Sequence, residues 1–195
     1  MVAPNFPQSV LQAQSNFRAI LDALSRPGTV RPLGQPVDAP SPLSIGAAAV
    51  ALALCDHDTP VWLDDCLSET AAIGDWLRFH CGCPLVTSPR EASFAFVGDA
   101  ASLPALEAFN PGTADYPDRS TTIVLTVRSF ETGSILSLRG PGIRGHISFR
   151  ADPLPADMSQ RLARNCLLFP RGVDLLLVTD NAVAGLPRSV RVVEN

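Results

Sequence analysis

The segment of residues 165–178 constrains the fold more than any other, because it joins the end of a helix to a buried strand. Pro170 stops the helix, since proline lacks an N–H group and disfavours helical geometry in the residue before it. Gly172 permits the turn that follows. Residues 173–178 are apolar except for Asp174, which is typical of a strand buried on both faces. The sequence therefore predicts a core strand with a charged residue near its start.

Two charged residues, Arg171 and Asp174, stand three positions apart at the entry to this strand. One interpretation is an ion pair between them that shapes the turn. The other is an arginine that the sheet edge presents to an anion. The segment alone favours the structural ion pair.

Length and composition indicate one ordered domain over residues 1–195. The chain is 46% hydrophobic and 17% charged, which is typical of a globular core and not of a disordered chain. Its net charge of −4 argues against nucleic acid as a partner. The longest apolar stretch, residues 45–55, is too short to span a bilayer, so no membrane partner is expected. Five cysteines without a secretory signal predict reduced thiols in the cytoplasm.

The absence of lysine excludes whole classes of chemistry, because all 15 basic residues are arginine. A Schiff-base lysine is ruled out, and with it the usual use of pyridoxal phosphate as a cofactor. The P-loop, whose lysine holds the phosphates of a nucleotide, is ruled out as well. Anion recognition would depend on arginine, which binds phosphate or carboxylate in a planar, bidentate manner.

Helical and strand patterns alternate along the chain. A first helix is predicted over residues 8–25, with Phe17, Ile20 and Leu21 among its apolar stripe. Ser41 and Pro42 are expected to open a second helix. Ser68 is expected to cap a third, which ends near Phe79, and a last helix covers residues 155–168. Strands are predicted at 29–33, 61–63, 93–97, 122–127, 133–138, 143–149, 173–178 and 190–192. This order predicts an α/β fold with a single mixed sheet flanked by helices.

The cysteine-rich segment around His80, Cys81 and Cys83 is weak evidence for a metal site, because its C-x-C spacing is not the C-x₂-C of zinc sites. We therefore expect no metal. A Cys–His hydrolase built on these residues is a third, weaker hypothesis. Asp56 and Asp58 flank His57, and these residues could bind a metal or act as acid–base groups. The favoured interpretation is that the carboxylates accept hydrogen bonds from backbone N–H groups of a turn.

Taken together, many short motifs resemble the PhnH subunit family of the bacterial carbon–phosphorus lyase system. They follow the family's order and span nearly the whole chain. They are Phe17-Arg18, Ser25-Arg26-Pro27-Gly28, Leu54, Asp58-Thr59-Pro60-Val61-Trp62-Leu63, Leu77-Arg78-Phe79-His80, Pro84-Leu85, Phe94-Ala95, Gly112-Thr113-Ala114, Leu138, Gly140-Pro141-Gly142-Ile143, Phe169-Pro170-Arg171-Gly172-Val173-Asp174-Leu175 and Leu186-Pro187-Arg188.

This resemblance implies a fold similar to the large domain of pyridoxal-phosphate-dependent transferases, but without that cofactor. It implies a homodimer that joins the subunits PhnG, PhnI and PhnJ in a core complex. With its partners, the subunit would be required to form ribose 1-phosphonate 5-triphosphate from ATP and a phosphonate. PhnJ would later break the C–P bond.

The resemblance assigns no catalytic residue to this subunit, so its status as an enzyme stays open. Charged residues at matching positions are the candidates for binding a phosphonate or nucleotide: Asp58, Arg78, His80, Arg171, Asp174 and Arg188. A structural role within the complex is the first hypothesis and anion binding by these residues is the second. A stand-alone anion- or nucleotide-binding protein is a further alternative.

Overall fold

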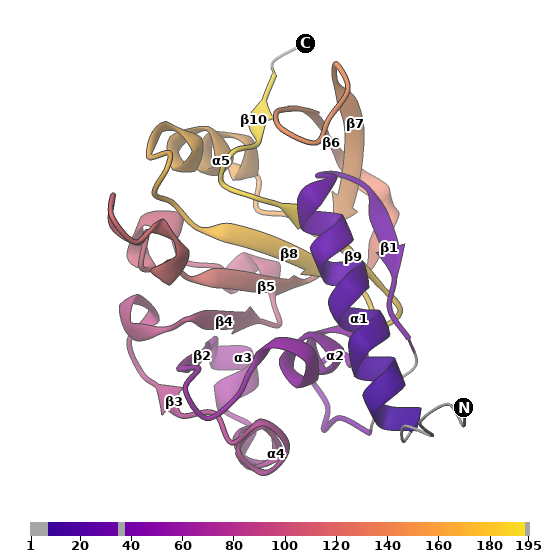
Figure 1. Ribbon diagram of the computed structural model, residues 1–195, viewed down its shortest axis with the longest axis vertical. Helices are drawn as coiled ribbons and strands as arrows, with labels where there is room; N and C mark the ends of the chain where they lie inside the picture. The colour runs from indigo at the N-terminus through magenta and orange to yellow at the C-terminus, as the bar shows by residue number, and fades with distance from the viewer. Residues whose placement is uncertain (1–7, 35–37, 194–195) are drawn as a thin grey trace, which may run out of the picture.

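The computed structural model describes residues 8–34 and 38–193, and its main feature is a mixed sheet in the order β1-β9-β8-β5-β4-β2-β3 (Figure 1). Strands β2, β3, β4, β5 and β8 are parallel, whereas β9 runs antiparallel to both β8 and β1. The predicted α/β class and mixed sheet are confirmed. The bounds of the strands are β1 Val30–Pro32, β2 Val61–Leu63, β3 Leu85–Val86, β4 Phe94–Val97, β5 Thr122–Thr126, β8 Asp174–Val178 and β9 Ala182–Leu186.

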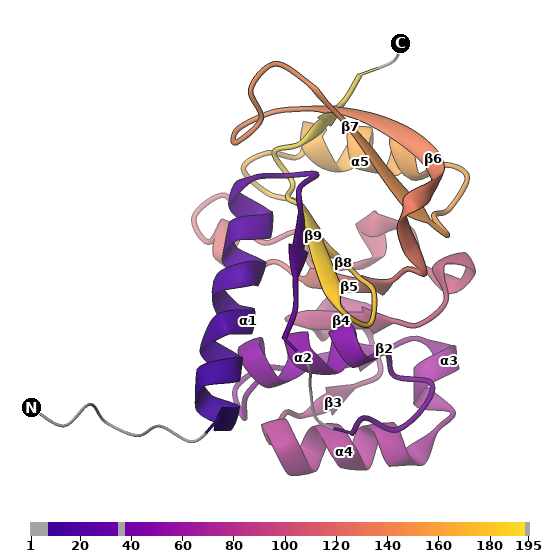
Figure 2. The same cartoon turned by 90° about the vertical axis from the view of Figure 1, so that its right-hand side faces the viewer.

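A second, antiparallel sheet corrects the expectation of a single one. It has the order β10-β6-β7, with β6 at Ser129–Arg139, β7 at Ile147–Asp152 and β10 at Arg191–Val192. The strands predicted near 133–138, 143–149 and 190–192 therefore exist, but they pair with one another and not with the large sheet. Figure 2 shows β6, β7 and helix α5 together, at the end of the molecule away from α4.

The helices are α1 Gln8–Ser25, α2 Ile45–Leu54, α3 Asp65–Ser68, α4 Ala71–Cys81 and α5 Met158–Leu167. Short 3₁₀ turns lie at Pro89–Glu91, Ala100–Ser102, Leu106–Ala108 and Pro117–Arg119. No helix in the described part of the chain is both long enough and apolar enough to span a bilayer. Residues 35–37, inside the loop expected before α2, lie outside the described residues.

Two predicted helix starts were wrong. Helix α2 is capped by Ser44, whose Oγ accepts a hydrogen bond from the Ala47 N–H at 3.2 Å, and not by Ser41. The predicted third helix is two helices, and Ser68 ends α3 instead of capping it. Asp64 caps α3 instead, because its carboxylate accepts from the Leu67 N–H at 3.1 Å.

Two apolar cores lie on opposite faces of the large sheet. One contains α1, α2 and α4, including Ile20, Val50 and Leu77, which are fully buried. The other lies beneath the small sheet and α5, and it includes Leu138 and Leu162. The large sheet is thus covered by helices on one face and by a sheet and a helix on the other.

The buried stripe of α1 is rotated from the predicted one. Ile20 and Ala23 are fully buried, whereas Phe17 and Leu21 are exposed. A Cβ at Gly185 of β9 would lie only 2.6 Å from the Ala23 carbonyl oxygen, so α1 approaches the sheet through two small residues. This close approach fixes which side of the helix faces the core.

The predicted core strand is confirmed as β8, whose residues Leu175–Val178 are fully buried between β5 and β9. Helix α5 ends at Leu167, just before Pro170, and Gly172 has a positive φ of 120°. The buried Asn165 side chain donates to the Val173 carbonyl oxygen at 2.8 Å and accepts from the Val173 N–H at 2.9 Å. The end of α5 is therefore held directly to the start of β8.

Candidate functional site

The predicted site residues do not come together. Asp174, Arg188 and Arg171 lie around the turn between α5 and β8, whereas Arg78 and His80 lie on α4. Figure 1 shows α4 and α5 at opposite ends of the molecule. Asp58 lies in the turn before β2. Within one chain, these residues therefore do not line a single site.

Asp174 forms its ion pair with Arg188, and not with Arg171 as the sequence suggested. Its Oδ1 accepts from the Arg188 backbone N–H at 2.8 Å and from Nε at 3.1 Å, and its Oδ2 accepts from Nη2. The two side chains are only 14% and 21% exposed. The β8–β9 hairpin, absent from the prediction, carries Arg188 back to the start of β8.

The Arg188 guanidinium also joins separate loops. Its Nη1 donates to the carbonyl oxygens of Pro117, at 2.6 Å, and Pro170, at 3.5 Å, and its Nη2 donates to the Ser120 hydroxyl. With the two bonds to Asp174, acceptors are present for all of the N–H donors that a guanidinium has. Arg188 is thus committed to holding the protein together.

Arg171, by contrast, is exposed on the same turn. Its backbone N–H donates to Leu168, but within residues 8–34 and 38–193 its side chain has no hydrogen-bond or ion-pair partner. Of the two charged residues that the sequence singled out here, Asp174 therefore has side-chain bonds within the described structure, and Arg171 has none.

Arg78 and His80 have separate surroundings on α4. Arg78 pairs with Asp75 at 3.3 Å and lines a hollow of about 520 Å³ near the carboxyl ends of β2 and β3. His80 instead packs its ring against Trp76, with centroids 4.6 Å apart, and against Phe79 at 4.9 Å. The two side chains therefore have different partners, although they are two residues apart on one helix.

The turn before β2 has the structural role that was favoured. Asp56 accepts hydrogen bonds from the Thr59 hydroxyl at 2.7 Å and from the Asp58 N–H at 3.0 Å. The hydrogen bond from Thr59 is the main cause of a lowered pKa at Asp56. Asp58 is itself exposed, and its carboxylate lies 3.3 Å from the His57 Nε2.

Among the described residues, no hydrogen bond joins His80 to the Cys81 or Cys83 thiol. The hydrogen bond to Cys83 raises the pKa of Cys81, and partial burial raises it further. That same bond lowers the pKa of Cys83, but Cys83 is only 1% exposed and its thiol points to the Leu77 carbonyl oxygen. No cluster of three or more possible metal ligands occurs among the described residues.

Asp64 is a buried hub that the sequence interpretation missed. Only 1% exposed, it accepts hydrogen bonds from the N–H groups of Gly98 and Asp99, at 2.9 and 3.1 Å, and from the Ser102 hydroxyl at 2.7 Å. It lies at the carboxyl ends of β2 and β4, where the strand order reverses, which is the usual ligand crevice of α/β sheets. Here the carboxylate of the protein itself satisfies those donors.

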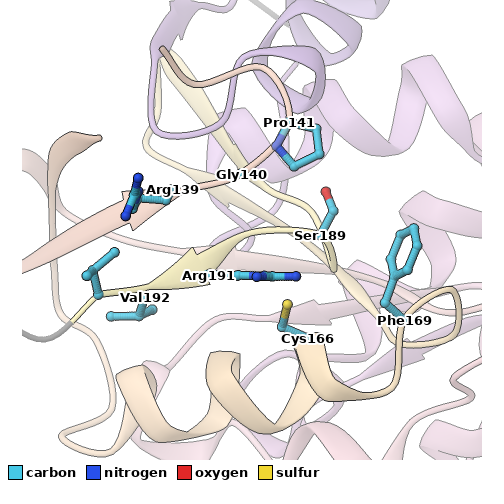
Figure 3. Close-up of a pocket in the computed structure, with 9 residues that line it drawn as sticks. Arg139, Gly140, Pro141, Cys166, Phe169, Ser189, Arg191 and Val192 are labelled. Atoms are coloured by element: carbon cyan, nitrogen blue, oxygen red, sulfur yellow. The ribbon is translucent and has the colours of Figure 1, made fainter. Parts of the chain in front are cut away.

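A groove between α5 and β10 carries arginines that form no ion pair with any residue of the described structure. Hollows of about 640 and 380 Å³ adjoin there and share Cys166, Arg191 and Val192. Figure 3 shows the Arg191 side chain reaching toward Phe169, between Ser189 and the Cys166 sulfur. We call this the α5–β10 groove, and its lining is Arg139, Gly140, Pro141, Ala163, Cys166, Leu167, Phe169, Ser189, Arg191, Val192 and Val193.

Comparison with known proteins identifies the family. Residues 4–193 match the family model described as "Bacterial phosphonate metabolism protein (PhnH)". A Rhizobium meliloti (strain 1021) protein, "Alpha-D-ribose 1-methylphosphonate 5-triphosphate synthase subunit PhnH", is 42% identical over 96% of this chain and 93% of its own length. A Stutzerimonas stutzeri protein, "Putative C-P lyase subunit protein HtxG", is 31% identical over 92% of this chain and 85% of its own. Both the family match and the identity extend over nearly the whole sequence, and the chain therefore belongs to the PhnH family.

Proposed function

We propose that this chain is a subunit of a carbon–phosphorus lyase core complex in organophosphonate catabolism. With its partner subunits it is required to form ribose 1-phosphonate 5-triphosphate from ATP and a phosphonate. The observation that carries this proposal is the 42% identity, over 96% of the chain, to a protein named as a subunit of ribose 1-methylphosphonate 5-triphosphate synthase. The partners are PhnG, PhnI and PhnJ, and the chain also forms a homodimer with a second copy.

Within that complex the subunit has a structural role and does not supply the reacting groups. Three observations support this role. The candidate residues lie at separate places, the guanidinium of Arg188 is occupied by Asp174 and nearby loops, and the buried Asp64 fills the usual ligand crevice. A protein built in this way offers surfaces to its partners more readily than an active site.

We further propose that the subunit works in the cytoplasm and without pyridoxal phosphate, even if its fold is similar to that of the transferases that use it. This chain has no lysine with which to form the internal Schiff base. Incubation with pyridoxal phosphate followed by borohydride reduction should leave no pyridoxyl group on any side chain. A labelled side chain in the mass spectrum would contradict this proposal.

Co-expression tests the function directly. Tagged PhnI should co-purify with PhnG, PhnJ and this chain, and deletion of this chain should stop growth on methylphosphonate as the only phosphorus source. Arg171→Ala and His80→Ala should restore growth to the deletion strain. If either variant joined the complex but failed to support phosphonate turnover, the structural role would be wrong. Failure of the parent chain to join the complex would refute the proposed function as a whole.

A further inference from the structure

Large apolar side chains stand exposed at the α5–β10 groove. Leu167, the last residue of α5, is 86% exposed, and Phe169 is 63% exposed. An exposed apolar patch beside a hollow is typical of a surface that another protein covers. The desolvated centre of such a surface is usually rich in aromatic residues and arginine, and this groove offers both.

The groove also contains two arginines without a compensating acid. Arg139 and Arg191 are directly opposite each other on β6 and β10, so both side chains are on the same face of the small sheet. Both are exposed, and neither forms an ion pair with any residue in 8–34 or 38–193. Like charges in this position destabilise a sheet, and a carboxylate between them would remove the repulsion.

We propose that the α5–β10 groove docks a segment of a partner subunit in which a carboxylate side chain adjoins a large apolar side chain. The carboxylate binds between Arg139 and Arg191, and the apolar side chain packs on Leu167 and Phe169. This inference rests on the proposed function, because it assumes that the chain is part of a complex.

A second copy of the chain fits the groove poorly. A two-fold symmetric contact brings the same patch of each copy together. It would therefore place the arginines of one groove against those of the other, which raises the repulsion that the groove already contains. A partner of different sequence with an acidic group has no such conflict. A small phosphate compound would satisfy the arginines but would leave Leu167 in water.

Two substitutions in the groove and two matched controls test this proposal. Leu167→Asp places a charge in the apolar part. Arg191→Glu places an acid opposite Arg139, which should stabilise the small sheet while it removes the binding charge. The controls are Phe79→Asp on α4 and Arg18→Glu on α1. Phe79 is 84% exposed and also lies in the last turn of its helix, and Arg18, like Arg191, is exposed and forms no ion pair with any residue in 8–34 or 38–193. Thermal unfolding of each isolated variant verifies that it folds.

The readout is the amount of this chain that co-purifies with tagged PhnI, PhnG and PhnJ. Leu167→Asp and Arg191→Glu should each reduce it at least tenfold, while both controls stay within twofold of the parent. If the parent binds and both groove variants bind equally well, this inference is refuted and the proposed function stands. If the parent does not bind, the proposed function itself is refuted.

Two further measurements distinguish other occupants of the groove. Light scattering should give the same molar mass for Leu167→Asp as for the parent, and loss of a dimer would assign the groove to a second copy. Calorimetric titration with ATP and tripolyphosphate should give the same result for the parent and for Arg191→Glu. If the parent binds either anion and Arg191→Glu does not, the groove is assigned to a small anion. Either result would overturn the docking proposal.

Discussion

The bond between Asp174 and Arg188 allows a decisive comparison of two arginines that are close together but play different roles. Arg188→Ala removes a guanidinium that is 14% exposed and leaves the Asp174 carboxylate, 21% exposed, without its counter-charge. Arg171→Ala removes an exposed guanidinium from the neighbouring turn. The structure predicts that the first change destabilises the fold and that the second does not.

The expected magnitude follows from the burial of the pair. Removing one partner of a fully buried ion pair costs about 3–5 kcal/mol. Because about a fifth of the Asp174 side chain is in contact with solvent, we reduce this cost to about 2–3 kcal/mol. For a chain of this size, 1 kcal/mol corresponds to about 2–4 °C in Tm, so Arg188→Ala should lower Tm by about 4–12 °C. Arg171→Ala should change the free energy of unfolding by at most about 0.5 kcal/mol.

Thermal and urea unfolding, followed by circular dichroism, measure both variants against the parent. Adding Asp174→Ala to Arg188→Ala should cost less than the sum of the single changes, because the pair is coupled. Growth on methylphosphonate supplies the functional readout. A Tm for Arg188→Ala within about 2 °C of the parent would refute this reasoning. So would an equal loss of stability in Arg171→Ala.

Further predictions concern packing, alkaline pH and the buried hub. A Cβ at Gly46 would overlap the Thr179 carbonyl oxygen, so Gly46→Ala should lower the free energy of unfolding, measured in urea, by about 1–3 kcal/mol. The control is Gly74→Ala in helix α4, which should be neutral or stabilising. Burial raises the pKa of the Cys55 thiol. The unfolded chain therefore loses that proton first, and stability should fall above about pH 8.5, by at most about 1.4 kcal/mol per pH unit for this thiol. Cys55→Ala should make the loss of stability with pH less steep. An unchanged slope would show that Cys55 is not its cause. Asp64→Ala should cost at least about 3 kcal/mol in the same urea experiment, since the buried Leu67 N–H and the part-buried N–H groups of Gly98 and Asp99 lose their acceptor. A cost below about 1 kcal/mol would refute the role of Asp64 as a hub.

Local signals predicted the elements well and their partners poorly. The end of α5 and the strand β8 followed from a proline, a glycine and an apolar run, each of which acts on its own neighbours. The separation of β6, β7 and β10 into a second sheet depends on pairing between distant segments, which no local pattern encodes. For the same reason one α/β domain was predictable, whereas its two-sheet arrangement was not.

The error over Asp174 has a specific origin in β9. The sequence Ala182–Leu186 carries Gly185, and a glycine inside a strand is a signal against a strand. Without β9 there was no hairpin to return Arg188 to the start of β8, so Arg171 was the nearest available cation. Gly185 also explains the rotated stripe of α1, because it lets the helix approach through Ala23. Gly185 therefore bears on both differences, through contacts that only the folded chain makes.

The position of Asp64 has a consequence for how this subunit can have taken up its role. Where related sheet architectures bind a substrate or coenzyme, this protein carries a carboxylate of its own, held by the backbone N–H groups of Gly98 and Asp99 after β4 and by the Ser102 hydroxyl of a 3₁₀ turn. A ligand could enter there only by displacing a group that the fold requires. A new binding function would therefore arise more easily at the surface, where arginine and exposed apolar side chains can be substituted without disrupting the core.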